Sequence, residues 1–459
     1  MRCFFILWLI IGSVQPLLTQ TDAPVYLKYL VEFSDKNNNP FSVKSPTEFL
    51  SPRALARRKK YNIPVTESDL PVNPSYLTAL ESFTKKIHHS SKWMNTALVT
   101  ADSKAAEEIA HFPFVKSVRY VGKPAGPNLL LRRSNKKRDS ESAPETTEHP
   151  HGFAELQNET INIQPLHDLN YRGAGILIAV LDGGFTNTDI MPFFDNVRAE
   201  SRFLPGRDFT DDDDFVYEST GHGSQVLSVM AADIPYLMVG TAPDATYVCL
   251  KTEDTGSEYP AEEVNWVAAL EYADSLGADI INSSLGYTTF SDKTFDYAYA
   301  NLDGKTAFAS QAADMAFEKG IIIVSAVGNE GNTPWKYLDV PADAEGVLAV
   351  GATDQAGYKA RFSSYGPTAD GRIKPDVSGP GQDVAVASVY TTEVKASKGT
   401  SFSAPLIAGA VAALWQAVPY RSPEEILEAV KLSADRATRP DNQTGYGIPD
   451  FAKAWELLR

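Results

Sequence analysis

The chain has 459 residues, enough for a prosegment and one large domain, and its 43% of hydrophobic residues allows a sizeable core. The formal net charge of −16 is unevenly spread: residues 21–138 carry 20 basic against 10 acidic side chains, and residues 139–459 carry 21 against 48. A basic segment can indicate nucleic-acid binding, but the acidic part of the same chain is the simpler partner, so we expect no nucleic acid.

The N-terminus has the pattern of a secretory signal, which we predict to span residues 1–20. Met1-Arg2 precedes an apolar run from Cys3 to Ile11, and polar residues follow. An uncleaved membrane anchor is the alternative, disfavoured because the run is short. No other apolar run in the sequence is long enough to span a membrane. We therefore expect a protein secreted to the periplasm or the extracellular space, with no membrane span once the signal is removed.

Residues 21–125 predict a small α+β domain. Ser51 followed by Pro52 is typical of a helix start, and basic residues up to Lys60 suit the end of that helix. We predict strands at 24–34, 93–100 and 115–121, and helices at 51–60, 76–86 and 103–111.

Residues 126–150 are predicted to be a processing linker. The run from Leu131 to Arg138 contains two clusters of basic residues, and the residues from Asp139 to Glu148 are mostly polar. Proteolytic cleavage concentrates in such stretches. A solvated charge run without a processing role is the alternative.

Residues 151–459 alternate apolar strands with helices. We predict strands at 176–181, 246–250, 279–285, 321–326 and 346–351, and helices at 261–276 and 310–319. Uniformly apolar strands are typical of buried parallel sheets, so the pattern predicts an α/β domain with a doubly wound, mostly parallel sheet. Ligands of such sheets bind at the carboxyl ends of the strands. Cys249, the only cysteine left after removal of the signal, lies in one of these strands and is interpreted as a buried thiol; a nucleophilic cysteine is the alternative, without a supporting signature.

A close-packed helix is predicted from the small and apolar residues between Ala404 and Trp415. Thr400 and Ser401 would start it, and Pro405 fits its first turn, where a missing N–H costs nothing. Ser401 would then lie among free N–H groups at the positive end of the helix dipole, where a developing oxyanion is stabilised. A simple N-cap serine is the alternative.

Three other polar residues lie at the ends of predicted elements. Asp182 ends the first apolar strand, His222 opens a helix, and Asn329 follows the strand at 321–326. Each residue alone is weak evidence of function, but Asp, His, Asn and Ser in this order are together the parts of a serine hydrolase. In this interpretation Ser401 is the nucleophile and His222 the general base, which Asp182 orients. The Asn329 amide and the backbone N–H of Ser401 would stabilise the oxyanion.

Seven motifs carry a family resemblance: Val-Leu-Asp182-Gly-Gly, Gly-His222-Gly-Ser, Asn282-Ser-Ser-Leu-Gly286, Val-Gly-Asn329-Glu-Gly, Phe362-Ser-Ser-Tyr-Gly-Pro367, Lys374-Pro-Asp-Val-Ser-Gly-Pro-Gly381 and Gly-Thr-Ser401-Phe-Ser-Ala-Pro. Together they resemble the subtilases, the subtilisin-like serine proteases of family S8, and in detail the secreted members from Bacteroidetes-type bacteria. The resemblance implies a subtilisin-like fold for residues 151–459 and an inhibitory, chaperone-like propeptide for residues 21–125. It further implies a secreted serine endopeptidase made as a zymogen, with protein or peptide substrates and its own propeptide as partners.

The resemblance also assigns two substrate-binding segments, an edge that pairs with extended substrate backbone and the opposite wall of the P1 pocket. They are Ser284, Leu285 and Gly286 for the edge, and Ala326, Val327 and Gly328 for the wall. Two departures matter. Gly183 stands where the family usually has Thr or Ser, and the segment 287–305, absent from compact members, is expected to flank the cleft. The sequence leaves the P1 preference open.

The chemistry implied by the resemblance needs no cofactor. The run from Asp211 to Asp214 offers oxygen ligands that suit a structural Ca²⁺, which subtilases often bind; a solvated acidic loop is the alternative, and no ligands are assigned.

Two other functions are weighed against the protease. A serine esterase would need Gly-x-Ser-x-Gly and the order Ser, Asp, His, which this chain lacks. A catalytically impaired binding protein on the same scaffold is disfavoured because all four candidate positions are intact.

Overall fold

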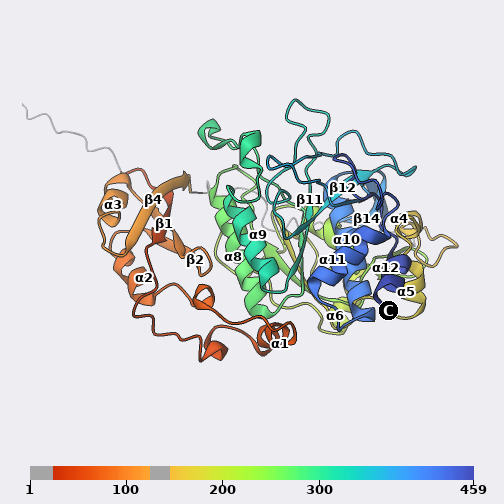
Figure 1. Ribbon diagram of the computed structural model, residues 1–459, viewed down its shortest axis with the longest axis horizontal. Coiled ribbons are helices and arrows are strands. Elements are labelled where there is room, and N and C mark those ends of the chain that lie inside the picture. Colours follow the sequence, from red (N-terminus) through yellow and green to blue (C-terminus); the bar gives the residue numbers. More distant parts are fainter. Residues whose placement is uncertain (1–23, 125–144) are drawn as a thin grey trace, which may run out of the picture.

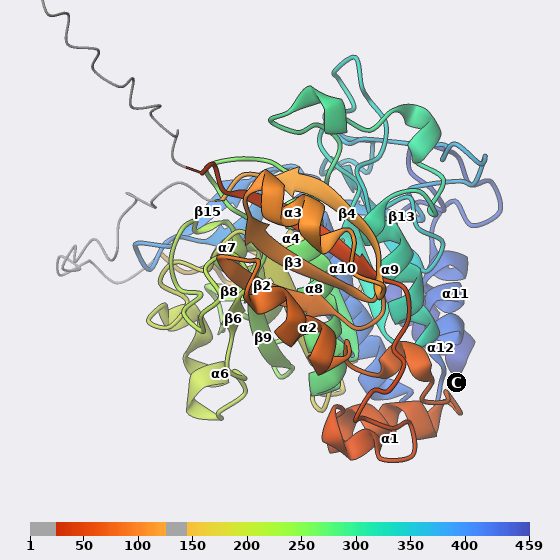
Figure 2. The same ribbon diagram turned by 90° about the vertical axis from the view of Figure 1, so that its left-hand side faces the viewer.

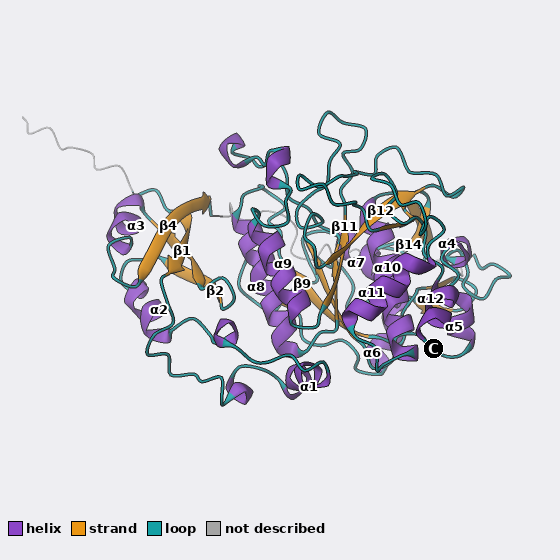
Figure 3. Cartoon of the chain, viewed as in Figure 1, coloured by secondary structure: helices purple, strands orange, loops and turns teal. Residues whose placement is uncertain are grey.

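The computed structural model describes residues 24–124 and 145–459, which form an N-terminal unit and a larger C-terminal unit (Figures 1 and 3). The predicted signal at 1–20 and most of the predicted linker at 126–150 lie outside the described residues. None of the described helices combines the length and the apolar character needed to cross a membrane.

The N-terminal unit is an antiparallel sheet with helices on one face, which agrees with the predicted α+β class. Its strands, in the order β2-β3-β1-β4, are β1 (Leu27–Phe33), β2 (Lys86–Ser91), β3 (Thr96–Ala101) and β4 (Val115–Gly122). The helices are α1 (Pro52–Lys60), α2 (Pro74–Glu81) and α3 (Ser103–Ile109), and single 3₁₀ turns occur at Pro46–Glu48 and Glu67–Asp69. The Ser51 side chain accepts a hydrogen bond from the Ala54 N–H and so starts α1 as the sequence predicts.

The predicted helix at 76–86 was wrong beyond Glu81, because Lys86 already begins strand β2. This strand pairs with β3 across a register shift between Ile87 and His89. A shifted edge strand with two adjacent histidines shows no alternation of apolar residues, so periodicity could not reveal it.

The C-terminal unit is built on a seven-stranded parallel sheet in the order β13-β12-β11-β10-β5-β9-β6, which confirms the predicted doubly wound class. Its strands are β5 (Leu177–Asp182), β6 (Arg207–Asp208), β9 (Thr246–Lys251), β10 (Ile280–Ser283), β11 (Ile322–Ala326), β12 (Val347–Thr353) and β13 (Val377–Pro380). Helices α7 (His222–Ala231) and α10 (Thr400–Ala417) pack with one apolar core of the sheet, and α8 (Ala261–Leu276) and α9 (Phe308–Glu318) with the other (Figure 3). Cys249 is buried in β9, as expected.

Shorter elements complete this unit. They are α4 (Glu155–Thr160), α5 (Gln164–Asp168), α6 (Asp195–Ala199), α11 (Pro423–Ser433), α12 (Phe451–Leu458), the hairpins β7 (Asp233–Ile234) with β8 (Met238–Val239) and β14 (Val384–Ala387) with β15 (Val394–Ser397), and 3₁₀ turns at Pro192–Phe194, Lys293–Phe295 and Tyr299–Asn301.

The N-terminal sheet lies against helix α8 of the C-terminal unit (Figure 2). Leu30 and Val121 on the sheet share one apolar cluster with Ala261 and Val264 on the helix. Removing this surface from water favours docking by about 25 cal/mol for each Å² buried.

A buried ion-pair network also joins the two units. Asp274, on α8, accepts hydrogen bonds from Arg57 and Arg58 of helix α1, and from Lys92 at 3.1 Å. Burial alone would raise the pKa of Asp274, but the three cations outweigh it and hold this pKa well below the usual range. The carboxylate is therefore charged across the physiological range, and each unit supplies charges that the other neutralises.

We predict that Asp274→Asn selectively loosens helix α1 in the uncleaved chain. The change leaves three cations partly unpaired in a buried place, which costs about 3–5 kcal/mol of local opening free energy. Amide hydrogen exchange should therefore speed up across residues 52–60. The control is Asp214→Asn, which removes an exposed partner of Arg207 and should change little. Unchanged protection of α1 in Asp274→Asn would show that apolar contacts alone hold it.

Candidate active site

The four predicted catalytic residues lie at the carboxyl edge of the parallel sheet or at helix N-termini facing it. Asp182 is the last residue of β5 and His222 the first of α7. Asn329 lies in the loop after β11, and Ser401 is the second residue of α10. The strand order places β5, β10 and β11 side by side, which brings these chain segments together.

Asp182 and His222 form a close pair. The Nδ1 atom of His222 lies 2.9 Å from both carboxylate oxygens of Asp182, and the Gly183 N–H donates to Oδ1 at 2.8 Å. Burial lowers the pKa of His222, but the charge and hydrogen bond of Asp182 outweigh it, so this pKa is raised overall. Because Nδ1 faces the carboxylate, Nε2 is left to exchange a proton with another group.

Gly183 brings no hydroxyl to this pair, as the sequence shows. Thr220 supplies one nearby, and its Oγ1 accepts a hydrogen bond from the backbone N–H of His222 at 3.2 Å. Thr220 therefore helps to hold the start of helix α7.

Thr400 and Ser401 start helix α10 as predicted, but the predicted place of Pro405 in the first turn was wrong. Gly399, with φ of 145°, is the N-cap, so Ser401 is not the cap and Pro405 lies inside the helix, not in its first turn. Proline cannot donate to the Ser401 carbonyl, four residues earlier. The Ser284 hydroxyl donates to that carbonyl instead, at 2.9 Å. The edge segment beginning at Ser284 is thereby fastened to Ser401.

The Ser401 hydroxyl lies beside the edge segment, and the residue that follows Ser401 lies near the His222 ring. Its Oγ is 3.4 Å from the carbonyl oxygen of Ser284, and the ring of the next residue, Phe402, is 5.7 Å from the His222 ring. Among the described residues no hydrogen bond joins Ser401 to His222. Such bonds are often long without substrate and tighten when it binds.

Asn329 is exposed and its amide is oriented by Thr400. The backbone N–H and hydroxyl of Thr400 lie 3.0 and 3.3 Å from Oδ1 of Asn329. Because Oδ1 is used as an acceptor, the Nδ2 hydrogens remain to donate elsewhere.

The two predicted substrate segments flank Ser401. The edge residues Leu285 and Gly286 follow β10 and are partly exposed, and the wall segment ends at Gly328, whose carbonyl accepts the Thr400 hydroxyl at 3.1 Å. Both segments are therefore fixed to the first turn of α10.

The segment 287–305 lies next to these residues. Tyr287 is buried with its hydroxyl on Glu253 at 2.7 Å, and Phe295 packs against Tyr120 of the N-terminal unit. One neighbour, Asp339, was missed: it is a single aspartate in a loop, and only the fold brings it between the two substrate segments.

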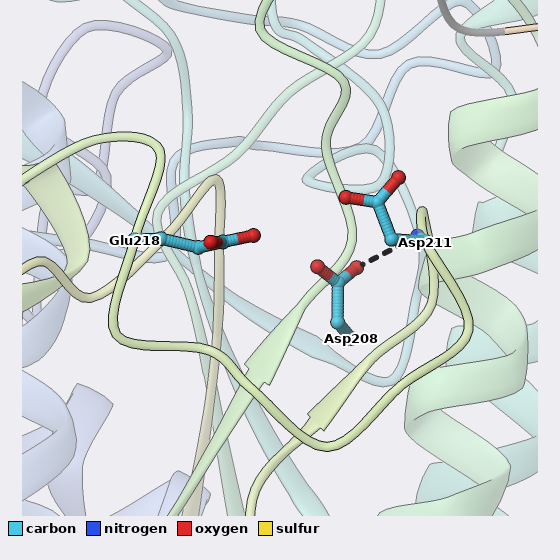
Figure 4. A group of neighbouring side chains, drawn as sticks. All are labelled: Asp208, Asp211 and Glu218. Atoms are coloured by element: carbon cyan, nitrogen blue, oxygen red, sulfur yellow. Dashed lines mark hydrogen bonds between the residues drawn. The ribbon is translucent and has the colours of Figure 1, made fainter. Parts of the chain in front are cut away.

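Two acidic clusters lie among the described residues, and the first of them already contains a cation of the chain. Asp208, Asp211 and Glu218 converge beside the predicted acidic loop (Figure 4). The buried ammonium of Lys251 already lies 2.6 Å from Asp208 Oδ2, and Thr210 and Asp211 donate to its Oδ1. The protein thus supplies its own cation there.

The second cluster consists of Glu253, Glu258 and Glu262, whose carboxyl groups have raised pKa values. Burial raises their pKa values to about 8, 7 and 11, respectively, with contributions from neighbouring carboxyl groups. Glu262 also accepts the backbone N–H groups of Asp254 and Tyr259.

Comparison with known proteins shows what the chain resembles. The family model described as the subtilase family, peptidase S8, matches residues 173–447, and the model of the Bacteroidota peptidase S8 propeptide domain matches residues 28–141. Subtilisin BL from Lederbergia lenta is 32% identical over 271 residues, 58% of this chain and 86% of that protein. Subtilisin DY from Bacillus licheniformis is 27% identical over 290 residues, 62% and 91% of the two chains. The MycP3 protease of the type VII (ESX-3) secretion system matches 65% of this chain and 87% of its own with a TM-score of 0.51 and 22% identity, which shows a shared fold.

We predict that His222 titrates above the ordinary value of 6.5 and that Asp182→Asn lowers its pKa. Burial, which disfavours the imidazolium, remains in the variant, whereas the carboxylate charge is lost. NMR titration of the ring, assigned by comparison with His222→Gln, measures this. Asp195→Asn, at an exposed ion pair, is the control. An unchanged pKa in Asp182→Asn would show that another group sets it.

Proposed function

The chain belongs to the subtilase family of serine proteases, and from this premise we propose that it is a secreted endopeptidase acting through Asp182, His222 and Ser401. The observation that carries the proposal is the pairing of Asp182 with His222 beside the first turn of α10, which carries Ser401.

The proposed reaction is acyl transfer through Ser401. His222 Nε2 accepts the hydroxyl proton as Oγ attacks the carbonyl carbon of the scissile peptide bond, and returns it to the leaving amine when the C–N bond breaks. Water, deprotonated by the same imidazole, then hydrolyses the ester. Asp182 holds the Nδ1–H tautomer and stabilises the imidazolium in both steps.

Two donors are proposed to stabilise the oxyanion. One is the backbone N–H of Ser401, at the N-terminus of α10, and the other is the Asn329 side chain, whose Oδ1 is anchored by Thr400. Loss of one such donor raises the barrier by about 3 kcal/mol. The substrate backbone would lie along Ser284 to Gly286, with its P1 side chain directed between this edge and the wall at 326–328.

The protein is further proposed to be exported and made as a zymogen. The predicted signal at 1–20 supports export. The propeptide family match and the docking of the N-terminal unit on α8 support autoinhibition by that unit. The predicted boundaries at 125 and 150 remain proposals.

We predict that a fluorophosphonate probe labels the mature enzyme at Ser401 and that Ser401→Ala abolishes labelling. Ser403→Ala, two residues along the same helix, should still be labelled. Peptide hydrolysis should fall about 10⁴-fold in Asp182→Asn and about 10²–10³-fold in Asn329→Ala. A folded protein that the probe does not label would support the alternative of an inactive binding protein. A protein that is labelled and hydrolyses esters, but not peptides, would support the esterase.

We predict that separately produced residues 21–138 inhibit the mature enzyme. The opposite net charges of the two parts should make association slower as salt rises. Dissociation should depend little on salt, because the pairs of Asp274 are buried and poorly screened. Stopped-flow inhibition kinetics measures both rates. Absence of inhibition would refute the zymogen proposal. Association that does not depend on salt would refute only the electrostatic part of that proposal.

A further inference from the structure

We propose that Asp339 makes the P1 pocket selective for lysine or arginine, so that this protein cuts after basic residues. The inference rests on the proposed function, because it assigns a substrate class to the same site. It starts from a carboxyl group at the junction of the two substrate segments.

The backbone at Asp339 joins the two walls of the pocket. The Asp339 N–H donates to the carbonyl of Val327, in one wall, at 3.0 Å. The next residue, Val340, forms an antiparallel bridge with Tyr287, which follows the other wall, with N–H···O distances of 2.9 and 3.2 Å. Residue 339 therefore forms the floor between the two segments.

The Asp339 side chain fills the space between a glycine of each wall. A methyl group added to Gly286 would lie 2.5 Å from Asp339 Cβ, and one added to Gly328 would lie 2.2 Å from Asp339 Oδ2. Any side chain at either glycine would displace the carboxyl group. Asp339 is only 7% exposed, so a substrate group that reaches it is largely removed from water.

A second carboxyl group converges on the same point. Glu330 Oε2 would lie 2.6 Å from the methyl group added to Gly328, and it accepts the Asn329 N–H at 2.7 Å. Thr288 donates to the other oxygen of Asp339 at 2.9 Å. Burial raises the pKa of Asp339 well above its ordinary value, and the charge of Glu330 raises this pKa further.

The pair lacks a positive partner from the chain. In the described ranges 24–124 and 145–459 no lysine or arginine forms an ion pair with Asp339 or Glu330. An ammonium or guanidinium group at P1 would supply it and form charge-assisted hydrogen bonds in a low-dielectric place. An apolar P1 side chain would cover the carboxyl pair without supplying a positive charge, at a cost in transition-state stability.

The chain itself contains matching sites. Five of the eight residues from Leu131 to Arg138, the run predicted to be processed, are lysine or arginine. A pocket that selects basic side chains would let the enzyme cut its own linker, without a second protease.

The test compares peptide substrates that differ only at P1, with Lys, Arg, Leu, Phe and Glu, on the mature enzyme. We expect kcat/KM to be at least about 10-fold higher for Lys or Arg than for Leu. Asp339→Asn should reduce kcat/KM for the basic substrates roughly 10- to 100-fold and change that for Leu by less than about threefold. Glu345→Gln, an exposed acid on the same loop, is the matched control and should preserve the profile.

A second measurement needs no variant. Benzamidine, a small cation, should compete with the Leu substrate in the wild-type enzyme, whereas uncharged benzamide at equal concentration should not. A preference for Leu, Phe or Glu, or no competition by benzamidine, overturns the inference. An equal effect of Asp339→Asn on all substrates overturns the assignment to Asp339. In each of these cases labelling of Ser401 by the fluorophosphonate probe shows that the proposed function stands; failure of both labelling and cleavage refutes that function instead.

Discussion

The architecture of the site depends on the carbonyl group of Ser401. Within α10 its hydrogen-bond partner would be the N–H of residue 405, which proline lacks. A buried carbonyl without a partner costs about 1–3 kcal/mol, so another donor is needed, and the Ser284 hydroxyl supplies it. That bond fastens the segment after β10 to the helix that carries the candidate nucleophile. The hydrogen bond that Pro405 cannot make in the helix and the position of the edge segment at Ser284 therefore depend on the same contact.

The order of the strands in the sheet determines which chain segments meet at this site. The sheet places β10 between β5 and β11, so the segments that carry Asp182, Gly286 and Gly328 leave the same edge. The sequence could predict this, because uniformly apolar strands followed by Gly and a polar residue indicate both a parallel sheet and the end where chemistry takes place. Asp182 and Asn329 were found in this way, whereas His222 was found at the start of a predicted helix.

What sequence reasoning missed depends on contacts between distant segments. Strand β2 exists because Lys86 to Ser91 pair with β3, which no local pattern shows. Lys251 was unremarkable in the sequence, yet its ammonium lies on Asp208 and leaves little reason for a metal ion there. Asp339 was likewise an isolated aspartate until the fold placed it between two glycines that are far apart in the chain.

The buried carboxyl groups of this protein differ in the partners that the chain gives them, and Asp339 differs from most of them in having no cation as a partner among the described residues. Asp274 and Asp208 are each matched by cations of the chain, and Glu262 accepts backbone N–H groups. These groups have structural explanations that need no ligand. Asp339 is buried beside Glu330, forms no ion pair with a cation among the described residues, and is the residue that we propose for the floor of the P1 pocket. A buried like-charge pair is costly to maintain, and that cost is offset when a cation binds between the two groups. The burial that raises the pKa of Asp339 would therefore favour a basic P1 residue beside it.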